Sequence, residues 1–270
     1  MNDNNIKKDD YFSLSELYHE KSKMRMIDKG FYSWINHVNT SPDIRRIISR
    51  PNYKHKGVKT ILLEKPAQQD ENKKYFDRTF YGRQSVREFK NEPLTFGNLS
   101  RILALGNGVT RKEEFPDGSV WSMRTTPSPG GLFPIEIYCV IQNVEGLDPG
   151  IFMYSPIDDC LFELRSETRD KIQEIVLKGM SSMKGSIRNS SAIILLASNM
   201  QRIKFKYKER AYRFALLETG HIAQNMLLAA ESENLGTVCV GGFLDDEVND
   251  IIQADGLDKM VQYCILVGKK

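Results

Sequence analysis

Two arginines and a serine at alternate positions form the first candidate for a phosphate-binding site. Arg83, Ser85 and Arg87 lie in an R-x-S-x-R pattern, and alternate residues of an extended strand point to the same side. Guanidinium groups bind phosphate oxygens through paired, charge-assisted hydrogen bonds. An exposed strand edge with two surface arginines has the same pattern. No P-loop and no G-x-G-x-x-G motif occurs, so neither a Walker nor a Rossmann nucleotide site is supported.

Two glycine-bearing loops could bring the backbone close to a ligand. Arg124 precedes the string PSPGG at residues 127–131, in which Ser128 supplies a hydroxyl group. Gly241 and Gly242 follow a strand-like run, and bare backbone at the end of a buried strand is a common position for a ligand. Both stretches could equally be plain connecting loops.

Lys206 and Tyr207 are candidates for proton transfer. Lysine and tyrosine side chains ordinarily have pKa values of about 10, so either one needs help to act as a base near neutral pH. A neighbouring ammonium group favours the tyrosinate form, and the positive end of a following helix does the same. A solvated helix entrance in a lysine-rich run is the alternative. The histidines show no metal-binding spacing, so no metal site is expected.

One long helix, predicted over residues 209–234, must position these candidates. Its apolar side chains recur at steps of three and four, the periodicity of a buried helical face: Tyr212, Ala215, Leu216, Ile222, Ala223, Met226, Leu227 and Ala230. Leu217, Leu228 and Ala229 widen this stripe, so we expect contacts on more than one side. At 1.5 Å per residue the helix would be about 39 Å long. We expect the chemistry at its two ends.

The other elements mix strands and helices without a regular β-α-β repeat, which predicts an α+β layer structure. Strands are expected over residues 135–141, 192–197, 237–240 and 261–267, with a hairpin formed by residues 151–154 and 161–164. Helices are expected over residues 95–106, 168–180 and 245–254, capped by Thr95, Thr168 and Asp245. The apolar side of the first of these helices contains Leu99, Ile102, Leu103 and Leu105, and Gly106 and Gly108 end it. Residues 109–123 read as a charged, irregular loop.

Residues 1–74 are expected to form an N-terminal extension, and residues 75–270 the main domain. Ser13 and Glu16 have the capping-box spacing and predict the start of a first helix. Ser41 opens a second short helix that runs through Ile48. A strand is expected over residues 59–64, followed by a polar linker over residues 66–74.

The composition indicates an ordinary soluble globular protein, with 40% hydrophobic and 27% charged residues. A net charge of +3 with interspersed signs gives no indication of nucleic-acid binding. Cys139, Cys160, Cys239 and Cys264 are far apart and lie in apolar runs, which favours reduced core thiols over zinc. The polar N-terminus has no apolar segment of a signal peptide, and no apolar run is long enough to span a membrane. A cytoplasmic location is expected.

Four strings of the sequence, in this order, resemble a known enzyme family: GRQSVREF, RTTPSPGGLFPIEIY, KFKYKERAYRFALLETGHIAQNMLLAA and LGTVCVGGF. The family is the nitroreductase superfamily of FMN enzymes, and within it the SagB-type branch, the azoline dehydrogenases of thiazole/oxazole-modified peptide biosynthesis. The resemblance covers residues 75–270, and YH-x-x-SK at residues 18–23 is similar to the N-terminal extension of that branch. It implies a central mixed or antiparallel sheet flanked by helices, FMN as cofactor, and a homodimer with the long helix at its interface.

The resemblance also implies roles for individual residues. The FMN site would be formed by Arg83, Ser85, Arg87, Arg124, Pro127, Ser128, Gly241, Gly242 and Lys269. The first three and Lys269 would hold the phosphate end, the glycine backbone would lie under the isoalloxazine ring, and the P-S element would reach the flavin from the partner subunit. Lys206 and Tyr207 match the dyad that distinguishes the branch. Pro129 stands where the branch more often has a small residue, so we expect a local backbone adjustment.

The implied reaction aromatises a thiazoline or oxazoline ring in a peptide. A base removes the acidified α-proton, and the adjacent ring carbon gives hydride to FMN, with molecular oxygen as final acceptor. Tyr207 is the expected base with Lys206 assisting it, although coupled groups also permit the reverse assignment. Cyclodehydratase and docking proteins would deliver the peptide. Two alternatives are a nitroreductase-like enzyme using NAD(P)H on quinones or nitroaromatics, and a flavin-free scaffold subunit.

Overall fold

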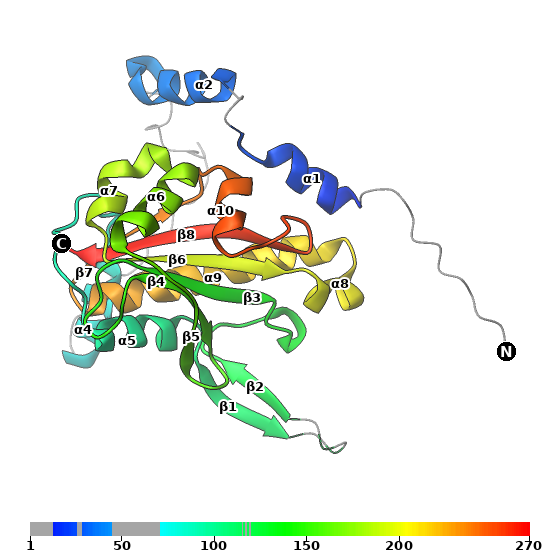
Figure 1. The fold of residues 1–270 in the computed structure, drawn as a ribbon. Helices are drawn as coiled ribbons and strands as arrows, with labels where there is room; N and C mark the ends of the chain where they lie inside the picture. The colour runs from blue at the N-terminus through cyan, green and yellow to red at the C-terminus, as the bar shows by residue number, and fades with distance from the viewer. Residues whose placement is uncertain (1–12, 26–28, 45–70, 115, 117, 119) are drawn as a thin grey trace, which may run out of the picture.

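The computed structural model describes residues 13–25, 29–44, 71–114, 116, 118 and 120–270. The strand predicted over residues 59–64, the linker residues before 71 and the helix beyond residue 44 lie outside these ranges. Figure 1 shows a central sheet with helices on both of its faces.

Six strands form the central sheet in the order β5-β4-β3-β6-β8-β7. Every pair of neighbouring strands is antiparallel. The strands are β3 (Ile135–Ile141), β4 (Gly150–Ser155), β5 (Cys160–Ser166), β6 (Ala192–Asn199), β7 (Leu235–Val240) and β8 (Lys259–Lys269). The strands predicted over residues 135–141, 192–197, 237–240 and 261–267 and the predicted hairpin are therefore confirmed, together with the α+β class.

Two hydrophobic cores lie on opposite faces of the sheet because its central strands are apolar on both sides. In β6, Ile194 and Leu196 belong to one core, while Ile193 and Leu195 belong to the other. The long helix α9 (Arg210–Ser232) and α5 (Phe96–Asn107) cover the first face. Helices α6 (Arg169–Gly179), α7 (Lys184–Asn189) and α10 (Asp245–Ile251) cover the second (Figure 1).

Helix α5 confirms its predicted cap and, to within one residue, its predicted end. The Thr95 side chain accepts from the backbone N–H of Asn98 in a capping box, Asn107 is the last helical residue and Gly108 is the C-cap. Gly106 lies inside the helix, and Leu105, expected on the apolar side, is 40% exposed. A Cβ atom at Gly106 would lie 2.5 Å from Cγ of Met226, so this glycine is the point of closest approach between α5 and α9.

The prediction of an irregular loop over residues 109–123 is wrong. Strands β1 (Val109–Glu114) and β2 (Val120–Arg124) pair there as an antiparallel hairpin that projects from the body of the molecule (Figure 1). Neither strand has a buried residue. The hydrophobic alternation that reveals a half-buried strand is therefore absent from this stretch.

The long helix α9 confirms the prediction over residues 209–234 to within two residues at each end, and a separate helix α8 (Gln201–Tyr207), which was not predicted, precedes it. Lys208, with φ of 47° and ψ of −128°, interrupts the helical conformation between α8 and α9. Lys206 and Tyr207 thus belong to the last turn of α8. We expected the positive end of the long helix to favour the tyrosinate form of Tyr207. This expectation needs correction, because Tyr207 lies at the carbonyl end of α8, where the helix dipole is negative.

Helix α10 and the thiols depart from prediction in smaller ways. Leu244 is the N-cap of α10, and Asp245 is its first residue. Cys139 and Cys264 are buried as expected, but Cys160 and Cys239 are only partly buried, and all four are free thiols.

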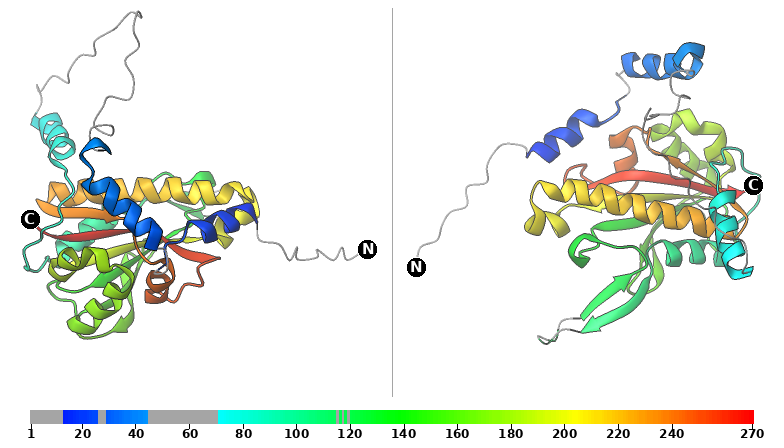
Figure 2. Two further views of the ribbon diagram at one scale, coloured as in Figure 1. Left: turned by 90° about the horizontal axis from the view of Figure 1, so that it is seen from above. Right: turned by 180° about the vertical axis from the view of Figure 1, so that it is seen from behind.

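The N-terminal extension includes helices α1 (Leu14–Ser22), α2 (Lys29–Thr40) and α4 (Glu71–Gly82). Ser13 and Glu16 form the predicted capping box of α1. Figure 2 shows α1 beside α8 and the beginning of α9. Helix α4 runs across residue 75, where the main domain was expected to begin. Within the described ranges, no helix combines the length and hydrophobicity that a membrane crossing would require.

Candidate functional site

The loop at residues 127–131 lies against Lys206 and Tyr207. Gly130 has φ of 64°, a conformation that favours glycine. A Cβ atom at Gly130 would lie 2.6 Å from Nζ of Lys206 and 2.6 Å from the phenolic oxygen of Tyr207. The backbone of this loop therefore approaches both polar groups more closely than any other residue type would allow. Two stretches singled out in the sequence meet here.

The ring of Tyr207 is held by packing while its hydroxyl group remains near Gly130. The ring is partly buried, and its edge contacts Phe214 with 4.8 Å between ring centroids. Nζ of Lys206 lies 5.3 Å from the centroid of the same ring. A phenol and an ammonium group thus converge on one glycine, the combination that proton transfer at a phenolic oxygen requires.

The hydroxyl group of Ser128 faces the protein interior. It donates a hydrogen bond to Oε2 of Glu218 and accepts one from the backbone N–H of Phe133 at 2.8 Å. The side chain that was expected to reach a ligand therefore fixes the loop instead, whereas Pro127 is exposed.

Glu218 is a residue of this site that the sequence analysis did not identify. It lies on α9 with no exposed surface, and burial raises its pKa to about 7. Its spacing from Ala211, Ala215 and Ile222 places it in the buried stripe of the helix. An acidic residue within such a stripe is the sequence signal that could have found it, because buried carboxyl groups are rare without a partner.

Arg124 packs beneath the loop at the end of β2. Its guanidinium lies 4.5 Å from the centroid of the Phe133 ring. Burial lowers the pKa of Arg124 to about 10, and the nearby Glu218 carboxylate opposes that shift. Arg124 also borders a cleft of about 390 Å³ between the β1–β2 hairpin and α8, whose apolar walls include Trp121 and Phe205.

The R-x-S-x-R segment lies beside the edge strand β7. Ser85 forms a parallel bridge with Thr237, and the N–H of Val86 donates to the carbonyl oxygen of Thr237 at 2.8 Å. Arg83 lies near Cys239, where its positive charge opposes the rise that burial causes in the pKa of that thiol. The segment therefore pairs with the sheet edge at a single bridge, and the alignment of its three side chains on one side stays a prediction.

Lys269 lies at the end of β8, close to the same segment. The N–H of Lys90 donates to the carbonyl oxygen of Lys269 at 3.0 Å. Arg87 is anchored through its own carbonyl oxygen, which accepts from the Ser186 hydroxyl at 2.6 Å. The side chains of Arg83 and Arg87 make no ion pair with any other described residue. Cations left open in this way fit an anionic group such as a phosphate.

Gly241 and Gly242 follow β7 and are exposed. A Cβ atom at Gly242 would lie 3.9 Å from Sδ of Met24, so the segment that follows α1 reaches this glycine. Met24 is held there by its N–H, which donates to the Asp245 carboxylate at 2.9 Å. Among the described residues, no hydrogen bond or ion pair joins these glycines to Lys206 or Tyr207.

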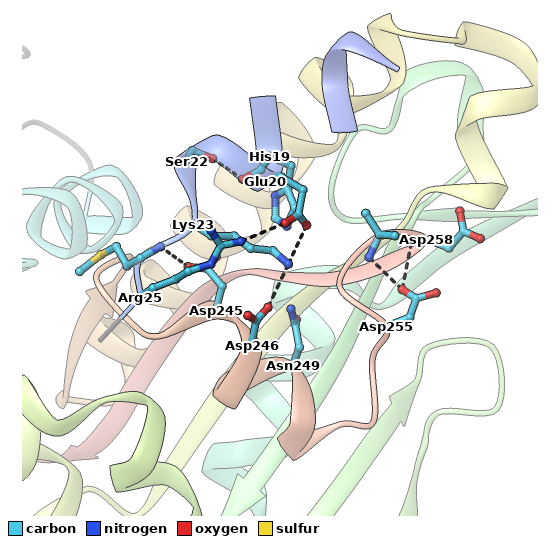
Figure 3. Close-up of polar contacts among 12 residues, drawn as sticks. His19, Glu20, Ser22, Lys23, Arg25, Asp245, Asp246, Asn249, Asp255 and Asp258 are labelled. Carbon is cyan, nitrogen blue, oxygen red and sulfur yellow. Dashed lines mark hydrogen bonds and ion pairs between the residues drawn. The ribbon is translucent and has the colours of Figure 1, made fainter. Parts of the chain in front are cut away.

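Helix α1 and the residue after it contact both α10 and the joint between α8 and α9. Lys23 lies between Glu20 of its own helix and Asp246 of α10, at 2.7 and 2.9 Å (Figure 3). At the other end, Glu16 pairs with Lys204 of α8, and the N–H of Ser15 donates to Glu209 at 2.9 Å. The joint between α8 and α9 is therefore held from outside by α1.

Two clusters of candidate residues result. The first contains the loop at residues 127–131, Arg124, Glu218 and the Lys206–Tyr207 dyad; the second contains the segment at residues 83–87 and Lys269. Across the described part of the chain, no group of three or more histidine, cysteine, aspartate or glutamate residues is gathered to hold a metal ion.

The chain belongs to the nitroreductase family, whose model matches residues 81–269. Its cofactor is FMN, and the open cations beside β7 fit the phosphate of that group. A putative nitroreductase of Methanocaldococcus jannaschii is 34% identical over 191 residues, 70% of this chain and 87% of that protein. The microcin B17-processing protein McbC of Escherichia coli is 29% identical over 145 residues, and the match spans 52% of either chain.

Solved structures with this fold include the E. coli microcin synthetase McbBCD complex with truncated pro-MccB17 bound. The likeness has a TM-score of 0.62 at 18% identity and covers 94% of this chain and 86% of that one. A putative nitroreductase from Anabaena variabilis has a TM-score of 0.61 at 27% identity, and the match covers 76% of this chain and 40% of the longer Anabaena chain.

Proposed function

We propose that this flavoenzyme is a dehydrogenase that oxidises thiazolines or oxazolines in peptides to the aromatic azoles. The observation that carries the proposal is the convergence of Nζ of Lys206 and the hydroxyl group of Tyr207 on Gly130. A flavin reductase that only passes hydride needs no such base, whereas azoline oxidation requires removal of a proton from carbon. The similarity to McbC, a protein named for microcin B17 processing, supports the same substrate class.

Tyr207 and Lys206 would have different roles in the removal of the proton. The Tyr207 oxygen takes the α-proton of the azoline, and the Lys206 ammonium stabilises the phenolate through its charge. Phe214 fixes the ring orientation. FMN supplies the acceptor for the hydride that leaves the adjacent ring carbon. In the reverse assignment Lys206 is the base and Tyr207 orients it, and molecular oxygen is the final acceptor in either case.

Arg83, Ser85, Arg87 and Lys269 would hold the phosphate of FMN, and the backbone at Gly241 and Gly242 would lie under its ring system. The exposed Pro127 and the backbone of its loop would complete the site from a second copy of the chain, with Ser128 and Arg124 supporting that loop from inside. Exposed Leu216 and Leu217 on α9, 41% and 53% exposed, support a homodimer through this helix. We further propose that cyclodehydratase and docking proteins deliver the peptide; the similarity to McbC, whose synthetase complex was solved with truncated pro-MccB17 bound, supports a peptide-modifying complex.

The test is to incubate the FMN-loaded protein with an azoline-bearing peptide and to follow the loss of two hydrogen atoms by mass spectrometry. Tyr207→Phe should abolish this loss and leave the flavin bound. Tyr75→Phe is a matched control, because the Tyr75 hydroxyl donates to the carbonyl oxygen of Ser232 at the far end of α9. Full activity in Tyr207→Phe would show that Tyr207 is not the base. Lys206→Met then tests whether Lys206 is the base.

A second function is favoured by the 34% identical nitroreductase relative. In that case NAD(P)H would reduce the flavin, and a quinone or nitroaromatic compound would reoxidise it. The same preparation decides between them: rapid NAD(P)H oxidation with a quinone, without change in the azoline peptide, would contradict the dehydrogenase proposal.

A further inference from the structure

Glu218 and Ser128 connect the interior of α9 to the loop at residues 127–131. The Glu218 carboxyl group is fully buried, and Ala215 and Ile222, one turn away on either side, are buried as well. Its hydrogen bond to the Ser128 hydroxyl is therefore made in a largely apolar environment, where such a bond is strong and its loss is costly.

Ser128 also binds the other end of the loop. Its Oγ accepts the N–H of Phe133 at 2.8 Å, so one hydroxyl group holds the two ends of the turn over residues 128–133. Gly130 lies within that turn and is the residue next to which Nζ of Lys206 and the Tyr207 hydroxyl lie. Displacement of Ser128 would therefore move the backbone that faces the dyad.

We propose that Glu218 is a positioning residue for the reaction assigned above: through Ser128 it holds the loop at residues 127–131 in register with Lys206 and Tyr207. This inference rests on the proposed function for its catalytic consequence. The link between Glu218 and the loop rests only on the hydrogen bonds and the close contact at Gly130.

The groups that face Glu218 make its charge state sensitive to pH. Burial is the largest influence and raises its pKa to about 7. Ser128, the backbone at Ile135, Arg124 of β2 and Arg202 of α8 all favour the carboxylate and offset part of that rise. Deprotonation strengthens the hydrogen bond from Ser128, because charge-assisted hydrogen bonds are stronger than neutral ones. The loop should consequently be held more firmly as the pH rises through neutrality.

Tyr154 of β4 faces the same cluster through Arg124, but it does not titrate in this range, because burial raises its pKa to about 12. Burial lowers the pKa of Arg124 only to about 10, so that guanidinium also keeps its charge at neutral pH. Glu218 is thus the group around the loop whose ionisation changes near neutrality.

The experiment uses Glu218→Gln in the full-length, FMN-loaded protein, since glutamine keeps the shape and one acceptor oxygen but cannot ionise. We expect kcat for azoline oxidation to fall by about tenfold, in line with the cost of small misplacements of reacting groups. The rise of kcat around neutral pH should disappear, while KM and flavin content stay unchanged. Hydrogen exchange measured by mass spectrometry should become faster over residues 127–133. Glu233→Gln, at the end of the same helix, is the control and should leave kcat, its pH dependence, KM, flavin content and hydrogen exchange unchanged.

Ser128→Ala tests the same link from the loop side and keeps the proposal testable if Glu218→Gln fails to fold. The double variant should lose no more activity than the more affected single variant, because both changes break one connection. Unchanged exchange over residues 127–133 together with an unchanged pH profile in Glu218→Gln would overturn the inference. Faster exchange in a protein whose wild type does not oxidise azolines would instead contradict the proposed reaction and leave the loop-holding role standing.

Discussion

Nδ1 of His19 and the phenolic oxygen of Tyr212 lie 3.0 Å apart and join α1 to α9 across 193 positions of sequence. The two rings also meet edge to face, with 5.8 Å between their centroids. His19 is 4% exposed. Burial, reinforced by the positive charge of Lys23, lowers its pKa, while the carboxylates of Glu20 and Asp246 oppose the shift. The folded protein therefore favours the neutral imidazole at this contact.

The attachment of α1 should weaken in mild acid. Because the pKa of His19 is lower in the folded than in the unfolded state, its contribution to stability is fully present above the ordinary value of 6.5 and is lost as the pH falls below it. The protection of residues 13–24 against hydrogen exchange, taken relative to the intrinsic exchange rate at each pH, should fall as the pH is lowered from about 7.5 to about 5.5. His19→Gln should reduce this pH dependence, whereas His37→Gln on α2 should not. Protection of residues 13–24 that is independent of pH would contradict the prediction.

Gly130→Ala should disable the dyad. The new methyl group would lie 2.6 Å from both Nζ of Lys206 and the Tyr207 oxygen, so these groups must move. We expect azoline oxidation to fall by at least about tenfold, with FMN still bound. Gly146→Ala is the matched control, since Gly146 has φ of 78° but no heavy atom within 4 Å of the added methyl group. Equal losses of activity in both variants would show that backbone strain, not displacement of the dyad, is responsible.

Arg83→Ala and Arg87→Ala should weaken FMN binding. Under the proposed assignment, each change would remove a charge-assisted hydrogen bond to the phosphate, worth about 1.5–3 kcal/mol, or roughly a 10- to 100-fold rise in Kd. Equilibrium titration followed by flavin fluorescence measures the effect. Arg165→Ala is the control, because Arg165 on β5 pairs with Glu167 at 2.8 Å and lies far from β7 in the sheet order. Unchanged affinity in both variants would exclude this segment as the phosphate site.

Two glycine replacements within α5 should have opposite effects on stability. A methyl group at Gly106 would lie 2.5 Å from Cγ of Met226, and such overpacking costs about 1–3 kcal/mol in unfolding free energy. At Gly97 the nearest atom is Oγ1 of Thr95 at 3.7 Å, so alanine should stabilise the helix by up to about 1 kcal/mol. Denaturant titration of the two variants checks both signs. A stabilised Gly106→Ala would mean that Met226 moves aside without cost.

Periodicity predicted the main elements of this fold well, because its core is strongly apolar. The run in β6 is covered on both faces, and the Thr95 and Thr168 caps stand where helices begin. The β1–β2 hairpin could not be predicted in this way, since its exposed strands show no hydrophobic alternation. Helix α8 was also not predicted, because Ile203 is the one buried residue among its seven and leaves no periodic signal.

In the candidate site, too, the residue types could be predicted from the sequence, whereas their contacts with one another could not. Residue types indicated that Lys206, Tyr207 and the glycine loop could do chemistry. The contact of Gly130 with that dyad depends on how α8 packs against the loop, which local patterns do not contain. Glu218 was hidden for the opposite reason: its position in an apolar stripe was visible, but its partner Ser128 is 90 residues away. The roles assigned to Arg83, Ser85, Arg87 and Lys269 stay predictions.

The location of α1 determines where the chain can be divided without loss. The family match begins at residue 81, so a fragment cut at that border would lack every residue of α1. Tyr212 would lose its imidazole partner, Lys204 its carboxylate, and Asp246 its ammonium group. Such a fragment would keep all six strands of the central sheet but would separate the α8–α9 joint from the turn that leads into α10. The shared fold and the smallest active unit are therefore expected to have different borders.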